Sequence, residues 1–247
     1  MSKSGVDAPV PWITTAQMVE IDRAMIEDYG IALIQMMENA GRSLAHLARE
    51  RFLGGDPQDR KVVVMAGTGG NGGGALVCAR RLTGWGADVH VVVSRPDEAF
   101  TQVPGHQLEI LRRMGVPIAN AGNTDPTLNA EPTLIIDGII GYSLQGAPRG
   151  TTADLIRIAN AQPAPVLSLD LPSGVDADSG EVFDPAVRAA ATLTLALPKI
   201  GLRAPGAEGH VGELYLADIG VPPSLYATPS IGLTVGPFFA TADVVRL

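Results

Sequence analysis

The sequence predicts an α/β fold in which a pair of helices precedes a parallel central sheet. Two observations lead to this prediction. From residue 61 onward, short β-branched runs alternate with segments of helical periodicity, and this alternation favours parallel strands joined by right-handed helical crossovers. Before residue 61, two segments carry apolar residues at helical spacing and show no strand pattern.

The helical pair is expected within residues 14–53. Thr14 or Thr15 is a suitable N-cap for the first helix, because a threonine hydroxyl can accept a hydrogen bond from a first-turn amide. Glu38 and Asn39 lie beside the apolar stripe of the second helix and are expected to face solvent. That stripe consists of Leu33, Met36, Met37, Ala40, Leu44 and Leu47.

The α/β core is expected over residues 61–222 of a single domain that spans residues 1–247. Its strands are predicted at 61–66, 88–94, 133–137, 164–170, 189–197 and 212–218. Helices are predicted within 74–86, 100–115 and 151–161. Residues 223–247 contain several prolines and are expected to form a C-terminal tail.

The composition disfavours several functional classes. The chain of 247 residues has a net charge of −8, which disfavours general nucleic-acid binding because that binding depends on lysine and arginine at phosphates. A single cysteine, Cys78, excludes an intrachain disulfide and indicates a reducing compartment. No run reaches the ~18 apolar residues of a membrane span, and the first twelve residues lack the apolar stretch of a signal peptide. A cytoplasmic protein without membrane contact is expected.

A glycine-rich loop, Gly-Thr-Gly-Gly-Asn-Gly at residues 67–72, follows the first predicted strand. Its spacing matches the dinucleotide fingerprint G-x-G-x-x-G, in which the backbone approaches a pyrophosphate at a helix N-terminus. A Rossmann domain for NAD would carry an acidic residue at the end of the second strand, but Arg95 stands there. In an NADP-dependent oxidoreductase, Arg95 would bind the 2′-phosphate of the cofactor. The simpler expectation is that Arg95 only faces solvent. No Tyr-x-x-x-Lys pair is present, so the oxidoreductase hypothesis ranks last.

Two further loops at the same sheet edge carry polar side chains. Asp137 ends the third predicted strand, Asp170 ends the fourth, and Ser173 lies in the turn after Asp170. Ligands of open α/β sheets bind at the carboxyl ends of the strands, so these groups are expected to converge with the glycine-rich loop. Either aspartate could act as a general acid or base, or could only cap its loop. With Asn71, Ser173 and backbone carbonyls, they could also form an oxygen cage for a hard or alkali cation.

Six segments, in this order along the chain, together resemble one known family. They are MMENAG, AGTGGNGGGALVCARRL, IIDGIIGYSLQG, SLDLPSGVDADSGEV, TLTLALPKIGL and LYLADIGVPP. The family is the YjeF N-terminal family, whose characterised members are NAD(P)H-hydrate epimerases, and the resemblance covers about residues 14–222. It implies a Rossmann-like three-layer sandwich with a mostly parallel sheet. The chain resembles the stand-alone form of the family and not the form fused to a dehydratase.

The resemblance also implies an activity. Its substrate would be NADH or NADPH to which water has added across the nicotinamide 5,6 double bond. The protein would interconvert the R and S forms at C6, so that a separate ADP/ATP-dependent, S-specific dehydratase can repair both. Asp170 would move the proton, either as the C6 hydroxyl leaves and returns or as the ring opens and closes. A homodimer is the family expectation.

Residue-by-residue matching implies the members of the site. One potassium ion per subunit would be bound by Asn71, Asp137 and Ser173, all of which this sequence retains. The predicted substrate contacts are Gly70, Asn71, Gly72, Gly73, Gly74, Gly141, Tyr142, Ser143, Leu144, Gln145, Gly146, Ala147 and Asp170.

The glycine-rich loop departs from the family pattern G-x-G-N-N-G-G-D-G. Gly70 stands at the first asparagine, Gly74 at the aspartate and Ala75 at the last glycine. Loss of a hydrogen bond to a charged ligand costs about 1.5–3 kcal/mol, so the substitutions predict weaker binding or an altered substrate. The alternative hypothesis is therefore a non-catalytic nucleotide-binding or scaffold protein of the same fold.

Overall fold

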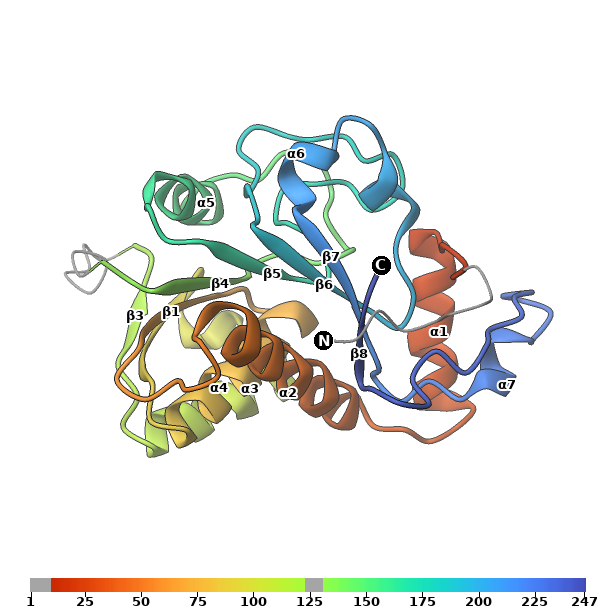
Figure 1. Cartoon of the computed structure of the whole chain (residues 1–247), viewed down its shortest axis with the longest axis horizontal. Helices are drawn as coiled ribbons and strands as arrows, with labels where there is room; N and C mark the ends of the chain where they lie inside the picture. The colour runs from red at the N-terminus through yellow and green to blue at the C-terminus, as the bar shows by residue number, and fades with distance from the viewer. Residues whose placement is uncertain (1–9, 123–130) are drawn as a thin grey trace.

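A computed structural model describes residues 10–122 and 131–247 of the chain. Its strands form one sheet in the spatial order β3-β2-β1-β4-β5-β6-β7-β8 (Figure 1). They are β1 (Lys61–Ala66), β2 (Asp88–Val93), β3 (Ile118–Asn120), β4 (Leu134–Gly138), β5 (Val166–Leu169), β6 (Ala191–Leu195), β7 (Glu213–Ala217) and β8 (Val244–Arg246). All neighbouring strands are parallel except β7 and β8. The predicted α/β fold with a mostly parallel sheet is confirmed.

Helices cover both faces of the sheet and give three layers (Figure 1). They are α1 (Thr15–Glu27), α2 (Leu33–Phe52), α3 (Gly70–Gly84), α4 (Gln102–Arg113), α5 (Thr151–Ala161), α6 (Glu208–Val211) and α7 (Pro223–Tyr226), with 3₁₀ turns η1 (Asp97–Ala99) and η3 (Ile200–Arg203). The helices α2, α3 and α4 lie on one face and α5 and α6 on the other, while α1 packs against α7. The expected three-layer sandwich and N-terminal helical pair are confirmed.

The chain order reverses at β1, because β2 and β3 lie on one side of it and β4 to β8 on the other. Strands β3-β2-β1-β4-β5-β6 have the order of a Rossmann domain, whose ligands bind outside the carboxyl ends of the strands at this reversal. Since β4 pairs with both β1 and β5, the loops that leave these three strands meet at one edge of the sheet.

Strand β1 illustrates why such a run becomes a buried central strand. Side chains of a strand alternate between its two faces. Val62, Val64 and Ala66 belong to the apolar cluster on the side of α2 and α3. Val63 and Met65 belong to the cluster on the side of α5. Complete burial of one valine or methionine contributes about 1.5–3 kcal/mol, so a strand that is apolar on both faces is stable only between two helical layers.

The N-terminal cap of α1 is formed as predicted. Thr14 is the N-cap residue, and its side chain accepts a hydrogen bond from the Gln17 amide at 3.2 Å. The Gln17 side chain in turn accepts from the Thr14 amide at 3.0 Å, which completes a capping box.

Three expectations require correction. Residues 223–247 are not only a tail, because they contain α7 and β8, and β8 pairs antiparallel with β7. The strand β3 was not predicted, because three residues carry too little pattern to identify. The helix α3 begins at Gly70, inside the glycine-rich loop, and not after the loop.

Glu38 is another correction, because it does not simply face solvent. Its carboxylate pairs with Arg80 of α3 at 2.6 Å and accepts from Gln107 of α4 at 3.3 Å, and 29% of its side chain is exposed. The neighbouring Asn39 donates to the carbonyl of Ile219 at 3.2 Å. The close packing of α2 on α3 brings these partners together.

Two expectations from composition can be compared with the structure. Cys78 is fully buried in α3, and this burial raises the pKa of its thiol, as expected for an inert core cysteine. Within residues 10–122 and 131–247, no helix combines the length and apolar character needed to cross a bilayer. The expectation about a signal peptide concerns mainly residues 1–9, which lie outside the described residues.

Candidate active site

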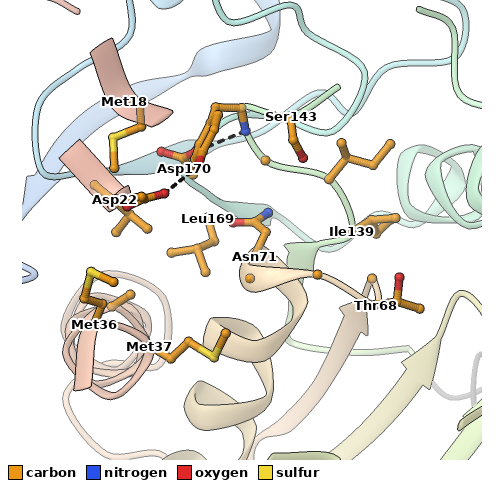
Figure 2. A pocket seen from close by; sticks show the side chains of 18 of the residues that line it. Met18, Asp22, Met36, Met37, Thr68, Asn71, Ile139, Ser143, Leu169 and Asp170 are labelled. Carbon is orange, nitrogen blue, oxygen red and sulfur yellow. Dashed lines mark hydrogen bonds between the residues drawn. The ribbon is translucent and has the colours of Figure 1, made fainter. Parts of the chain in front are cut away.

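A cavity of about 440 Å³ lies at the carboxyl edge of the sheet, where the loops after β1, β4 and β5 meet α1 and α2. Figure 2 shows Asp22 and Asp170 close together at this cavity, with Asn71 nearby. Met36 and Met37 of α2 form an apolar wall. The predicted convergence of the three loops is therefore observed.

The glycine-rich loop has a packed part and an open part. A Cβ at Gly67 would lie 2.0 Å from the carbonyl oxygen of Ile139, and a Cβ at Gly72 would lie 1.8 Å from the carbonyl oxygen of Gly67. Only glycine permits such approaches. At Gly69 and Gly70, which line the cavity, a Cβ would meet no described atom within 4 Å. At Gly69 and Gly70, a larger side chain would therefore fit at the cavity wall.

Three of the glycines predicted to contact substrate, Gly72, Gly73 and Gly74, do not line the cavity. They are buried in the first turns of α3. A Cβ at Gly73 would lie 2.6 Å from the sulfur of Met37, and a Cβ at Gly74 would lie 2.8 Å from a methyl carbon of Leu169. These glycines allow α3 to pack closely against α2 and β5.

Asp170 directly follows β5 and is only 3% exposed. Its φ of +65° lies in the left-handed region, which costs a non-glycine residue about 1–3 kcal/mol. Its amide donates to the carbonyl of Leu193 at 2.7 Å. Its carboxylate accepts hydrogen bonds from the Tyr142 amide at 3.2 Å and from the ammonium of Lys199. This turn presents the carboxylate to the cavity between two fixed donors.

Lys199 is a residue of the candidate site that the sequence reasoning missed. Its side chain is completely buried, and besides Asp170 it donates to the carbonyl of Leu195 at 2.9 Å. A buried ammonium is costly unless it is paired and hydrogen-bonded, and both conditions are met. The available signal was a lysine just after an apolar strand, at the sheet edge that carries Asp137 and Asp170.

Asp137 and Ser173 are buried beside the cavity and do not line it. The Asp137 carboxylate accepts from the Ser173 hydroxyl at 2.6 Å, the Ser173 amide at 2.9 Å, the Ser168 hydroxyl at 2.8 Å and the Ile139 amide at 3.2 Å. Burial raises the pKa of Asp137, and these hydrogen bonds oppose that rise. The network holds the ends of β4 and β5 together.

Asn71 brings a buried side-chain amide to the site. Both atoms of its amide are shielded from solvent, and neither has a hydrogen-bond partner among the described residues. A Cβ at Gly141 would lie 3.2 Å from the amide carbon of Asn71 and 3.3 Å from a carboxylate oxygen of Asp170, so the three loops touch here. An unpaired buried polar group costs about 1–3 kcal/mol. The amide oxygen, with the oxygens of Asp137 and Ser173, has the donor chemistry of a hard cation site.

Seven residues of the loop after β4 were predicted to contact the substrate. Three of them line the cavity, namely Gly141, Tyr142 and Ser143. The Tyr142 hydroxyl donates to a carboxylate oxygen of Asp22 in α1 at 2.5 Å, while its amide donates to Asp170. Tyr142 thus connects the N-terminal helix to the end of β5. The residues that do not line the cavity are Leu144, Gln145, Gly146 and Ala147.

Arg95 is exposed, as expected, and it also lines the cavity together with Ser94 and Thr152. The hydroxyl of Thr151 donates to the carbonyl of Ser94 at 2.7 Å, which holds the start of α5 against the end of β2. This end of the cavity therefore carries a cation and hydroxyl groups.

Residues 33–201 match the family model of the YjeF-related protein N-terminus. A relative from Dehalogenimonas lykanthroporepellens, named NAD(P)H-hydrate epimerase, is 43% identical over 95% of this chain and 92% of its own. The chain belongs to the YjeF N-terminal family. The resemblance inferred from its motifs is confirmed.

Two further relatives and one solved structure are also similar to this chain. A Truepera radiovictrix protein named NAD(P)H-hydrate epimerase is 41% identical over 89% of this chain and 92% of its own. The bifunctional NAD(P)H-hydrate repair enzyme Nnr of Salinibacter ruber is 36% identical over 90% of this chain, which spans 43% of that longer relative. The crystal structure of yeast ynu0 superposes with a TM-score of 0.78 at 24% identity, covering 96% of this chain and 100% of its own, and has the same fold.

Proposed function

We propose that this protein is an isomerase, an NAD(P)H-hydrate epimerase that interconverts the R and S forms at C6 of hydrated NADH or NADPH. Relatives that match nearly its whole length carry this name. The observation that carries the proposal is the placement of Asp170. Its carboxylate is held by Lys199 and presented to a cavity that a dinucleotide-type glycine loop also lines.

The chemistry at C6 suits a carboxylate. C6 carries a hydroxyl group and is bonded to the ring nitrogen N1, whose lone pair assists cleavage of the C6–O bond under acid assistance. Asp170 takes and returns the proton as the hydroxyl leaves and returns, or as the ring opens and closes. Lys199 balances the charge of Asp170 and fixes its orientation.

The cavity also offers a place for the rest of the dinucleotide. The open glycines Gly69 and Gly70 lie at the N-terminus of α3, where backbone amides and the helix dipole favour a pyrophosphate. In a Rossmann arrangement the adenosine half extends toward the end of β2, which is where Arg95 lines the cavity. The nicotinamide ring then lies at the other end, beside Asp170.

A potassium ion is part of the proposal, and Asn71, Asp137 and Ser173 would hold it. The buried, unpaired amide of Asn71 and the oxygen chemistry of Asp137 and Ser173, which hydrogen-bond to each other, support this choice. A bound ion would supply a fixed positive charge to the site. We further propose that the protein acts together with a separate ADP/ATP-dependent dehydratase. We also propose that it is a homodimer and is located in the cytoplasm.

The alternative of a non-catalytic nucleotide-binding or scaffold protein rests on Gly70 and Gly74. Gly74 is buried against Leu169 and does not line the cavity. Only Gly70 therefore removes a polar side chain from the cavity wall, while Asp170, Lys199 and Asn71 are all in place. This balance favours an active enzyme with weakened substrate binding.

A coupled assay tests the proposed function. Purified R-form NADH hydrate is offered together with an S-specific dehydratase, and the loss of the R form is compared with its spontaneous rate in potassium and in sodium buffers. We expect the protein to accelerate this loss, and to do so more strongly with potassium. No acceleration in either buffer would exclude the epimerase, and equal acceleration in both would exclude the potassium site.

Restoring the family asparagine at Gly70 is expected to tighten substrate binding. A side chain fits there, because a Cβ would meet no described atom within 4 Å. A hydrogen bond to a charged ligand contributes about 1.5–3 kcal/mol, which corresponds to a KM for hydrated NADPH that is about tenfold lower or more. The matched control is Gly84→Asn at the other end of α3, where a Cβ also meets open space. An unchanged KM in Gly70→Asn would show that the missing side chain does not limit binding.

A further inference from the structure

We propose that Asp22 of α1 is the second acid–base group of this site and acts on the opposite face of the C6 centre from Asp170. The inference rests on the proposed epimerase function. It adds Asp22, a residue of the N-terminal helix that lies outside the Rossmann core. Neither the motifs nor the family matching assigned Asp22 to the site.

The placement of Asp22 supports this role. Asp22 lines the cavity and lies close to Asp170 (Figure 2). One of its carboxyl oxygens, Oδ2, accepts the hydrogen bond from the Tyr142 hydroxyl. Among residues 10–122 and 131–247, its other oxygen has no hydrogen-bond partner, so it is available to a ligand. The Tyr142 hydroxyl bonds Asp22 and the Tyr142 amide bonds Asp170, so one residue fixes both carboxyl groups at the cavity.

The two carboxyl groups have different electrostatic surroundings. Asp170 forms an ion pair with Lys199 and is therefore a carboxylate that can accept a proton. For Asp22, burial is the main cause of a raised pKa, and the charge of Asp170 adds to it, while the Tyr142 hydrogen bond and Lys199 oppose it. Asp22 consequently keeps its proton to a higher pH than an ordinary aspartic acid. The proposed reaction needs one group that donates a proton and another that accepts one. The different surroundings of the two aspartates allow them to take these two roles.

The proposed step balances in atoms and electrons. In one direction the C6 oxygen takes a proton from Asp22 and leaves as water, while the N1 lone pair forms a C6–N1 double bond. A water molecule then adds to the opposite face of C6 and gives its proton to Asp170, and the electron pair returns to N1. One C–O bond breaks and one forms, and a proton passes from Asp170 back to Asp22 before the next turnover. The reverse reaction exchanges the roles of the two aspartates.

Three variants separate proton transfer from positioning. Asp22→Asn keeps an oxygen that can accept from Tyr142 but cannot supply a proton. Tyr142→Phe removes that hydrogen bond and keeps the carboxyl group. Glu27→Gln makes the same acid-to-amide change on α1 at a side chain that is 64% exposed and does not line the cavity. Thermal unfolding of each variant reports whether it folds.

We expect Asp22→Asn to lower kcat by about 100-fold or more, the usual contribution of a general acid or base. Tyr142→Phe should lose less than about tenfold, and Glu27→Gln should match the parent protein. The residual activity of Asp22→Asn should no longer fall as the pH rises, because that fall in the parent reflects loss of the Asp22 proton. In ¹⁸O-water, the S form produced by the parent should carry the label at its C6 hydroxyl.

Several outcomes would overturn the inference. They are near-parent activity of folded Asp22→Asn, equal losses in Asp22→Asn and Tyr142→Phe, or an unlabelled product. The first two would leave Asp22 with no role or with a positioning role, and the third would exclude departure of the hydroxyl. Absence of any acceleration by the parent protein would instead overturn the proposed function itself.

Discussion

Asp170→Asn is expected to remove the catalytic acceleration, so that the R form disappears only at its spontaneous rate. Asparagine has nearly the shape of aspartate and can still accept from the Tyr142 amide, which lies 3.2 Å from the carboxylate. It cannot accept or return a proton at C6. We expect kcat/KM to fall at least about 100-fold, mainly through kcat, when measured with hydrated NADH and excess S-specific dehydratase.

A loss of stability must be separated from this loss of catalysis. Asp170→Asn leaves the buried ammonium of Lys199 without its carboxylate partner. The double variant Asp170→Asn with Lys199→Met removes both charges, and replacement of a buried ion pair by apolar groups is often neutral for stability. We expect the double variant to unfold near the temperature of the parent and to stay inactive. Activity in either folded variant would show that the proton is moved by another group.

Lys199→Met alone is expected to be strongly destabilising. It leaves the Asp170 carboxylate, only 3% exposed, without its ammonium partner. Removal of one partner of a buried ion pair costs about 3–5 kcal/mol, which for a chain of this size lowers the unfolding temperature by roughly 6–20 °C. Urea unfolding followed by circular dichroism measures this free energy directly.

Lys61→Met is the matched control, since Lys61 is exposed at the start of β1. Surface substitutions of this kind usually change stability by less than about 0.5 kcal/mol. If Lys199→Met cost no more than Lys61→Met, the ion pair would not stabilise the fold. If the cost persisted undiminished in the double variant, the loss would come from packing and not from the unpaired charge.

Several parts of the fold could be predicted because they depend on local pattern. The β-branched runs and the glycine-rich loop identified the strands that carry the site. Asp137, Asp170 and Asn71 could be placed at one edge, because each follows or ends a parallel strand and such strands all point the same way. The strands β3 and β8 were not predicted. Each has only three residues, which form a strand only because they pair with β2 and β7, respectively.

The sequence by itself therefore determined the α/β fold, the sheet edge where the cavity lies and the aspartate that follows β5. Only the tertiary structure decided which side chains surround that aspartate. Lys199 reaches Asp170 because β6 lies next to β5, and Asp22 reaches the cavity because α1 packs over its end. Strand and helix periodicities are local properties of the chain. Contacts between residues 22, 142, 170 and 199 are not, because they arise only when the sheet order and helix packing bring distant segments together.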